Sequence, residues 1–223
     1  MAFIQPAKAG TESKQALQWL VEGNTRFAEN HSTDLNESAE RRTEVSKGQK
    51  PFAVILSCVD SRVPPELIFD RGLGDLLVVR TAGQVLDSAV LGSLEFGVAE
   101  MGIPLLMVLG HERCGAVHAT LDAEEHGTHV EGNIQTLIEG IRPAVEEAKK
   151  QTGDLLDNAV TANVLHVLNA LKQSPILSKA LTQGTLQIVG ARYDLDTGKV
   201  EILPQNGEPE LRNPEKIQMR DKR

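Results

Sequence analysis

The two cysteines of this chain each follow an apolar run that is typical of a buried strand. Cys58 comes shortly after residues 52–56, and Cys114 comes shortly after residues 104–109, with His111 three positions before it. If the two strands are parallel neighbours, their carboxyl ends meet at one edge of the sheet. Ligands bind at that edge in open α/β sheets. Two thiols and one imidazole would then converge.

Two cysteines and one histidine form a donor set that suits zinc. Thiolates favour zinc over magnesium or calcium, and three protein ligands with one open position are typical of a catalytic zinc site. A single turn at a helix start could aim both His111 and Cys114 at one ion, and the helix N-terminus favours the thiolate form of Cys114. The alternatives are two inert buried cysteines or a disulfide.

Several motifs in order resemble the β-class carbonic anhydrase family. The resemblance covers about residues 16–204 and is more specific than the zinc donors alone, because separate motifs follow one another in the family's sequence. The residues that carry it are Gly23-Asn24-Thr25-Arg26-Phe27, Cys58-Val59-Asp60-Ser61-Arg62, Arg80-Thr81-Ala82-Gly83, Gly110-His111-Glu112-Arg113-Cys114-Gly115, Gly190-Ala191-Arg192-Tyr193-Asp194-Leu195 and Gly198-Lys199-Val200.

The resemblance implies a lyase that hydrates carbon dioxide reversibly to bicarbonate and a proton by means of zinc-bound hydroxide. It implies one zinc ion per chain, held by Cys58, His111 and Cys114, and a homodimer or higher homo-oligomer. Gln49 stands nine positions before Cys58. In plant-like members of the family a glutamine at this offset enters the substrate pocket, often that of the partner chain, so the resemblance makes Gln49 a catalytic residue. The alternative is an ordinary surface glutamine before a strand.

The residues beside Cys58 suit the rest of this chemistry. Two thiolates and a neutral imidazole cancel the charge of zinc, so a bound water should be less acidic than in a three-histidine site, where its pKa is about 7. Asp60 could compensate by accepting a hydrogen bond from that water or hydroxide, and Arg62 could keep Asp60 ionised. An apolar wall for a small nonpolar substrate would come from Val63, Ala82 and Ile103.

One position bears on regulation. In some family members the aspartate closes onto the zinc at lower pH, and these members usually carry a tryptophan three residues before the first cysteine, where it belongs to a bicarbonate effector site. This chain has Ile55 there. We therefore expect the open, plant-like type, with Asp60 off the metal and paired with Arg62.

Other functions stay open at this stage. A relative of the family hydrolyses carbon disulfide or carbonyl sulfide with the same zinc ligands. A noncatalytic zinc or bicarbonate-sensing protein is a second alternative, although it would not need Asp60 and Arg62. A thiol enzyme is disfavoured, because cysteine phosphatases need an arginine six positions after the cysteine and Cys58 has Arg62 only four positions on.

Composition sets the broad class. The chain has 223 residues and a formal net charge of -8, which argues against binding to nucleic acid or to an anionic membrane surface; the small-molecule substrate, carbon dioxide or bicarbonate, is what the resemblance implies. The sequence has no apolar run near the roughly twenty residues of a membrane span and no signal pattern. We expect a cytoplasmic protein with a single domain over 1–223, comprising an N-terminal helical arm at 1–47 and a C-terminal tail at 205–223.

The elements that must position the site follow from periodicity. A helix is predicted from Glu12 to about Ala28, and Gly23 is a point at which it could break. Strands and helices then alternate, which indicates parallel crossovers and an α/β fold with a central, mostly parallel sheet flanked by helices. The later elements are expected as helices at 131–151, 154–173 and 175–183, and as strands at 185–191 and 199–203.

Overall fold

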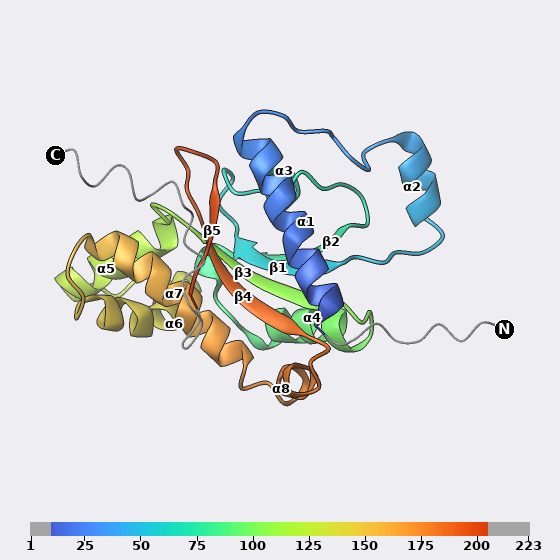
Figure 1. Cartoon of the computed structure of the whole chain (residues 1–223). Coiled ribbons are helices and arrows are strands. Elements are labelled where there is room, and N and C mark those ends of the chain that lie inside the picture. The colour runs from blue at the N-terminus through green and yellow to red at the C-terminus, as the bar shows by residue number, and fades with distance from the viewer. Residues whose placement is uncertain (1–9, 205–223) are drawn as a thin grey trace.

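A computed structural model describes residues 10–204 of the chain. A five-stranded sheet forms its centre, in the order β2-β1-β3-β4-β5 (Figure 1). The first four strands in this order run parallel, and β5 pairs antiparallel with β4. The strands are β1 (Ala53–Cys58), β2 (Leu76–Thr81), β3 (Leu105–His111), β4 (Gln187–Tyr193) and β5 (Val200–Ile202).

Helices cover both faces of the sheet, so the fold is the α/β arrangement that the sequence predicts. Helix α1 crosses one face, and α4 lies behind the sheet in the same view (Figure 1). The helices are α1 (Thr11–Ala28), α2 (Ala39–Val45), α3 (Pro65–Ile68), α4 (Ser88–Ala99), α5 (Gly115–His126), α6 (Ile134–Ala148), α7 (Leu155–Leu171) and α8 (Pro175–Thr182), with a 3-10 turn η1 (Ala82–Gln84) after β2.

Alternate residues of β1 serve two different core clusters. Val54 and Leu56 are buried in the cluster that includes Leu94 of α4. Ile55 faces the other way and is buried with Ala16 and Leu20 of α1. Because successive side chains of a strand point to opposite faces, a run that is apolar at every position needs cover on both sides. The sheet is therefore a rigid platform whose edge can hold a site.

The N-terminal helix belongs to this fold. It continues through Gly23, where the sequence allowed a break. A Cβ at this glycine would lie 1.8 Å from the carbonyl oxygen of Phe69, so Gly23 serves close approach between segments. The indole of Trp19 meets Phe52 edge to face at 5.1 Å yet remains 40% exposed, so it packs the helix down only in part.

The predicted strands and helices are present, with boundaries shifted by a few residues. Strands β1 and β3 each run two residues beyond the apolar runs that predict them and end on Cys58 and His111. No helix within residues 10–204 is long and apolar enough to cross a membrane. The tail predicted at 205–223 and the first nine residues of the predicted arm lie outside the described residues.

Candidate metal centre

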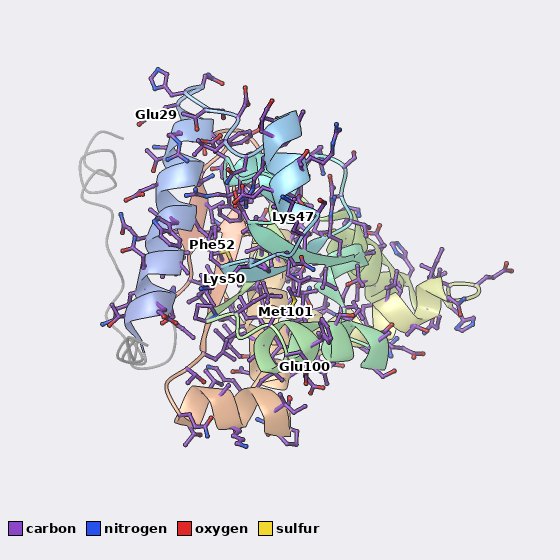
Figure 2. The ribbon with its side chains drawn as sticks, turned by 90° about the vertical axis from the view of Figure 1, so that its right-hand side faces the viewer. Glu29, Lys47, Lys50, Phe52, Glu100 and Met101 are labelled. Carbon is purple, nitrogen blue, oxygen red and sulfur yellow. The ribbon has the colours of Figure 1, made fainter. Side chains whose placement is uncertain are left out.

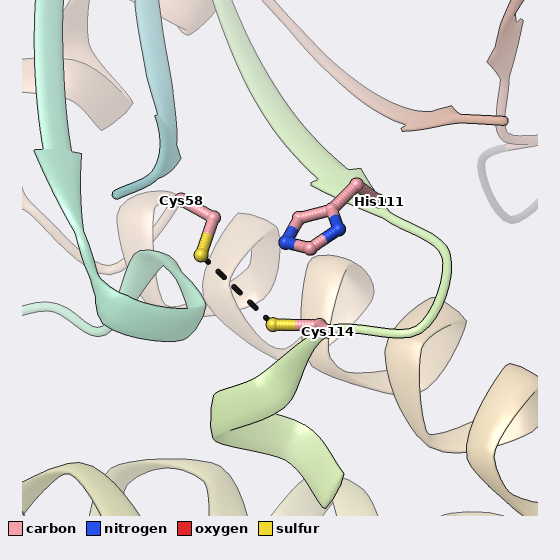
Figure 3. Close-up of side chains that lie close together, drawn as sticks. All are labelled: Cys58, His111 and Cys114. Atoms are coloured by element: carbon pink, nitrogen blue, oxygen red, sulfur yellow. Dashed lines mark hydrogen bonds between the residues drawn. The ribbon is translucent and has the colours of Figure 1, made fainter. Parts of the chain in front are cut away.

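Three elements bring the predicted ligands together at the carboxyl edge of the sheet. Cys58 ends β1, His111 ends the neighbouring parallel strand β3, and Cys114 is the N-cap residue of α5. Their side chains point toward one another (Figure 3), with one ligand atom from each residue lying within 4.8 Å of the others. All three residues are at most 3% exposed. The parallel pairing of two strands thus creates the cluster.

The cluster fits a tetrahedral metal ion. The two sulfurs lie 3.9 Å apart, and two sulfurs bound to one tetrahedral zinc at about 2.3 Å each would lie about 3.8 Å apart. The Nδ1 atom of His111 is 2.8 Å from the carbonyl oxygen of Glu112, which fixes the proton on Nδ1. The Nε2 atom is buried and has no hydrogen-bond partner within residues 10–204. Its lone pair is therefore aimed into the cluster and available for a metal.

The protein already favours a thiolate at Cys58. A hydrogen bond with Cys114, aided by the neighbouring imidazole of His111 and by the backbone N–H of Gly83 at 3.3 Å, lowers the pKa of Cys58. The same bond raises the pKa of Cys114. Of the two thiols, one therefore loses its proton easily, and the other keeps its proton. A bound cation would take the place of that remaining proton.

Asp60 and Arg62 form a two-pronged ion pair beside the cluster. Arg62 donates from Nε to Oδ1 at 2.9 Å and from Nη2 to Oδ2 at 2.8 Å. These bonds hold the pKa of Asp60 well below its usual range. The Oδ2 atom lies 3.8 Å from Nε2 of His111, which is too far for a hydrogen bond. Asp60 is therefore an ionised group at the border of the site, oriented by Arg62.

Arg80 has a role that the sequence did not reveal. The sequence marked it only as the first residue of the motif Arg80-Thr81-Ala82-Gly83. In the structure its guanidinium donates from Nε to the carbonyl oxygen of Cys58 at 2.9 Å and from Nη2 to that of Asp60 at 2.7 Å. Arg80 therefore clamps the backbone that carries both the first sulfur and the carboxylate.

Asn163 is a second residue that sequence reasoning missed. It lies on α7 and donates from Nδ2 to the carbonyl oxygen of Gly83 at 2.8 Å. Gly83 in turn donates its N–H to the sulfur of Cys58. The sequence singled out the Arg80–Gly83 turn, but nothing in it marks a residue 80 positions further on as that turn's partner.

The structure does not bring Gln49 to this site. Gln49 is exposed and precedes β1, whereas Cys58 ends that strand. It lies in a shallow pocket with Val45 and Leu73. Lys50 and Phe52, which follow it, and Met101, which precedes β3, lie on the same side of the molecule (Figure 2). This side is the amino edge of the sheet, opposite the metal cluster.

Two members of the predicted apolar wall are elsewhere. Ile103 is 1% exposed and belongs to the core cluster of α4, before β3 begins. Val63 is fully buried in the core cluster under α1. The prediction that Ile103 and Val63 form a wall of the substrate pocket was therefore wrong, because both side chains fill the hydrophobic core. Ala82 is partly exposed and lies in η1 beside the cluster.

Comparison with known proteins agrees with this geometry. The sequence model of the family "Carbonic anhydrase" matches residues 53–200. The chain is 42% identical over 193 residues to carbonic anhydrase 2 of Mycobacterium tuberculosis, covering 86% of this chain and 93% of that protein.

Two solved structures share the fold. The β-carbonic anhydrase CcaA has a TM-score of 0.66 and 26% identity over 84% of this chain and 95% of its own. The Coccomyxa β-carbonic anhydrase in complex with acetazolamide has a TM-score of 0.66 and 26% identity over 89% of this chain and 88% of its own. With the cluster of two sulfurs and one imidazole at the expected edge of the sheet, this chain belongs to the β-carbonic anhydrase family.

Proposed function

We propose that this protein catalyses the reversible hydration of carbon dioxide to bicarbonate and a proton, with one zinc ion per chain held by Cys58, His111 and Cys114. One observation carries the proposal. In a member of the carbonic anhydrase family, three buried donor atoms lie within 4.8 Å of one another. The imidazole nitrogen among them has no other partner within residues 10–204.

The chain's own residues divide the work. When bound, zinc supplies Lewis-acid activation of a water molecule. The carbonyl oxygen of Glu112 holds the imidazole of His111 so that Nε2 faces the ion. Asp60, kept ionised by Arg62, accepts a hydrogen bond from the reacting water and orients the lone pair that attacks carbon dioxide. Asp60 and Arg62 are thus the proposed catalytic residues that each chain supplies beside its own metal centre.

The open-site type is part of the proposal. A carboxylate that closed onto the metal would have to leave Arg62. In this structure both oxygens of Asp60 accept hydrogen bonds from Arg62. Ile55, which has no exposed surface, stands where the regulated members carry tryptophan. Both observations favour a site in which Asp60 stays beside the ion and is not one of its ligands.

The role of Gln49 requires a second copy of this chain. Gln49 precedes β1, and Cys58 is the last of the six residues of that strand, which spans about 20 Å. Gln49 can therefore orient substrate only in the pocket of another subunit. We propose a homodimer or higher homo-oligomer in which Gln49 does so. We also propose a cytoplasmic location, because both cysteines are free thiols that must stay reduced to bind metal.

The test is stopped-flow carbon dioxide hydration, with zinc content measured on the same samples. We expect rapid turnover by the wild type, with about one zinc per chain. His111→Ala should lose both zinc and activity. His126→Ala is the matched control, since His126 is an exposed histidine on α5 and its loss should change neither. Hydrolysis of carbon disulfide without hydration of carbon dioxide would contradict the proposal, as would full activity in His111→Ala.

A further inference from the structure

The turn η1 approaches the metal centre from behind Cys58. Gly83 in this turn has φ 62° and ψ 22°, a left-handed conformation that favours glycine. A Cβ at this position would lie 2.6 Å from Cδ1 of Ile141. The backbone N–H of Gly83 donates to the sulfur of Cys58 at 3.3 Å in a buried environment. The direction of this bond is therefore set by how the turn is held.

Asn163 holds the other side of the same glycine. Its Nδ2 donates to the carbonyl oxygen of Gly83 at 2.8 Å, and the residue has no exposed surface. Its Oδ1 has no hydrogen-bond partner within residues 10–204. Burying an amide that is only half satisfied costs free energy, so an apolar residue would serve packing better. The other buried residues of α7 are all apolar, namely Ala159, Val160, Ala162, Val164, Val167, Leu168 and Leu171.

We propose that Asn163 is a positioning residue for the metal centre: it holds Gly83 in the orientation in which the backbone N–H donates to the sulfur of Cys58. The inference rests on the zinc site proposed above. The hydrogen bond draws electron density from the sulfur and fixes its position. Partners of this kind, one step removed from the metal, commonly contribute 10-fold to 100-fold in metal affinity or activity.

Loss of this hydrogen bond has a defined spectroscopic direction. An N–H donor lowers the energy of the sulfur lone pairs. Without the donor, less energy is needed to move an electron from sulfur to a metal ion. In a cobalt(II)-substituted protein, the sulfur-to-cobalt charge-transfer band should therefore move to longer wavelength when Gly83 is released. A loss of packing elsewhere in α7 would not change this energy.

The experiment compares two substitutions on α7 in the cobalt(II) protein. Asn163→Leu keeps the branched shape of the side chain and removes its N–H. We expect a charge-transfer band at longer wavelength and cobalt affinity lowered about tenfold in competition with a chelator. Val167→Ala is the control. Val167 lies one turn further along α7 and is 3% exposed. It belongs to the core cluster on the α4 side of the sheet. This substitution should lower the melting temperature and leave the band in place.

Specific outcomes would overturn the proposed role of Asn163. An unshifted band and unchanged cobalt affinity in Asn163→Leu would overturn the inference, and so would an equal shift in Val167→Ala. A wild-type protein with no charge-transfer band would overturn the proposed metal site, and this inference with it. If Asn163→Leu does not fold by circular dichroism, Asn163→Ala takes its place, because a smaller side chain places no methyl groups against Gly83. The same shift is expected, and its absence would overturn the inference.

Discussion

Two aspartates ten residues apart, Asp60 and Asp70, each pair with an arginine, but in opposite surroundings. The side chain of Asp60 is 17% exposed and that of its partner Arg62 is 52% exposed. The side chain of Asp70 is 2% exposed and that of Arg26 is 27% exposed. The first pair is local in sequence and borders the metal centre. The second joins the end of α1 to the segment after α3.

The two carboxylates differ in whether their oxygens are free to contact a further group. Asp70 accepts hydrogen bonds from Arg26 and from both the backbone N–H and the hydroxyl of Thr33, so its oxygens are committed to holding three segments together. Within residues 10–204, the carboxylate oxygens of Asp60 accept hydrogen bonds from Arg62 alone, and the carboxylate still faces the metal centre. The same ion-pair chemistry thus borders the candidate metal centre, where we propose that it serves catalysis, and stabilises the fold at the other place.

The largest expected effect comes from Asp60→Asn. This change removes the anion that is proposed to accept a hydrogen bond from the reacting water. A positioned acid or base typically contributes 10²-fold to 10⁴-fold, so we expect kcat to fall by about 10²-fold or more. Zinc content and melting temperature should change little, because the pair is exposed and local. Stopped-flow hydration with zinc analysis checks this, and an unchanged kcat would contradict the role of Asp60.

Asp70→Asn should show the opposite pattern. It leaves Arg26 without its buried partner, which should lower the free energy of unfolding by about 3 kcal/mol. At temperatures where the variant stays folded, its zinc content and kcat should match the wild type. Urea unfolding at fixed protein concentration measures the loss. The matched control is Asp34→Asn, at an exposed aspartate next to Thr33, which should be almost neutral.

The pH dependence of the Asp70 effect has a definite sign. Burial alone would raise the pKa of Asp70, but hydrogen bonds from Arg26 and Thr33 outweigh it, and the net shift is downward. A lowered pKa in the folded state stabilises the protein above the unfolded-state pKa of about 3.9. The stability gap between the wild type and Asp70→Asn should be constant from about pH 7 to 5 and should narrow below about pH 4. A gap that narrows already between pH 7 and pH 5 would mean that the pKa is raised.

The smallest effect is expected for Arg80→Met. Arg80 touches the carbonyl oxygens of Cys58 and Asp60 and none of their side chains, so its loss should loosen the carboxylate without removing it. We expect kcat to fall about tenfold and zinc to dissociate faster. Arg42→Met, at an exposed arginine of α2, is the control and should match the wild type. A loss as large as that of Asp60→Asn would mean that Arg80 acts on the substrate directly.

The sequence predicted the elements of this protein and the residues that cluster at its candidate metal centre. Apolar runs that need cover on both sides predict β1 and β3, and the donors Cys58, His111 and Cys114 come at or just after the ends of those runs. Parallel neighbouring strands place such residues at one edge of the sheet. Periodicity and residue type were therefore enough to predict that these donors lie together. The partner of Asp60 was also readable, because Arg62 is two residues away.

Only the tertiary structure decided what supports those residues. Asn163 lies 80 residues from Gly83, Asp70 lies 44 residues from Arg26, and Arg80 lies 22 residues from Cys58. The structure also assigned Ile103 to the core and Gln49 to the far edge of the sheet. The physical reason is that a side chain's role in a hydrogen-bond network depends on which segments pack against it. Local periodicity records which face of an element is buried and carries no information about the residue that it meets there.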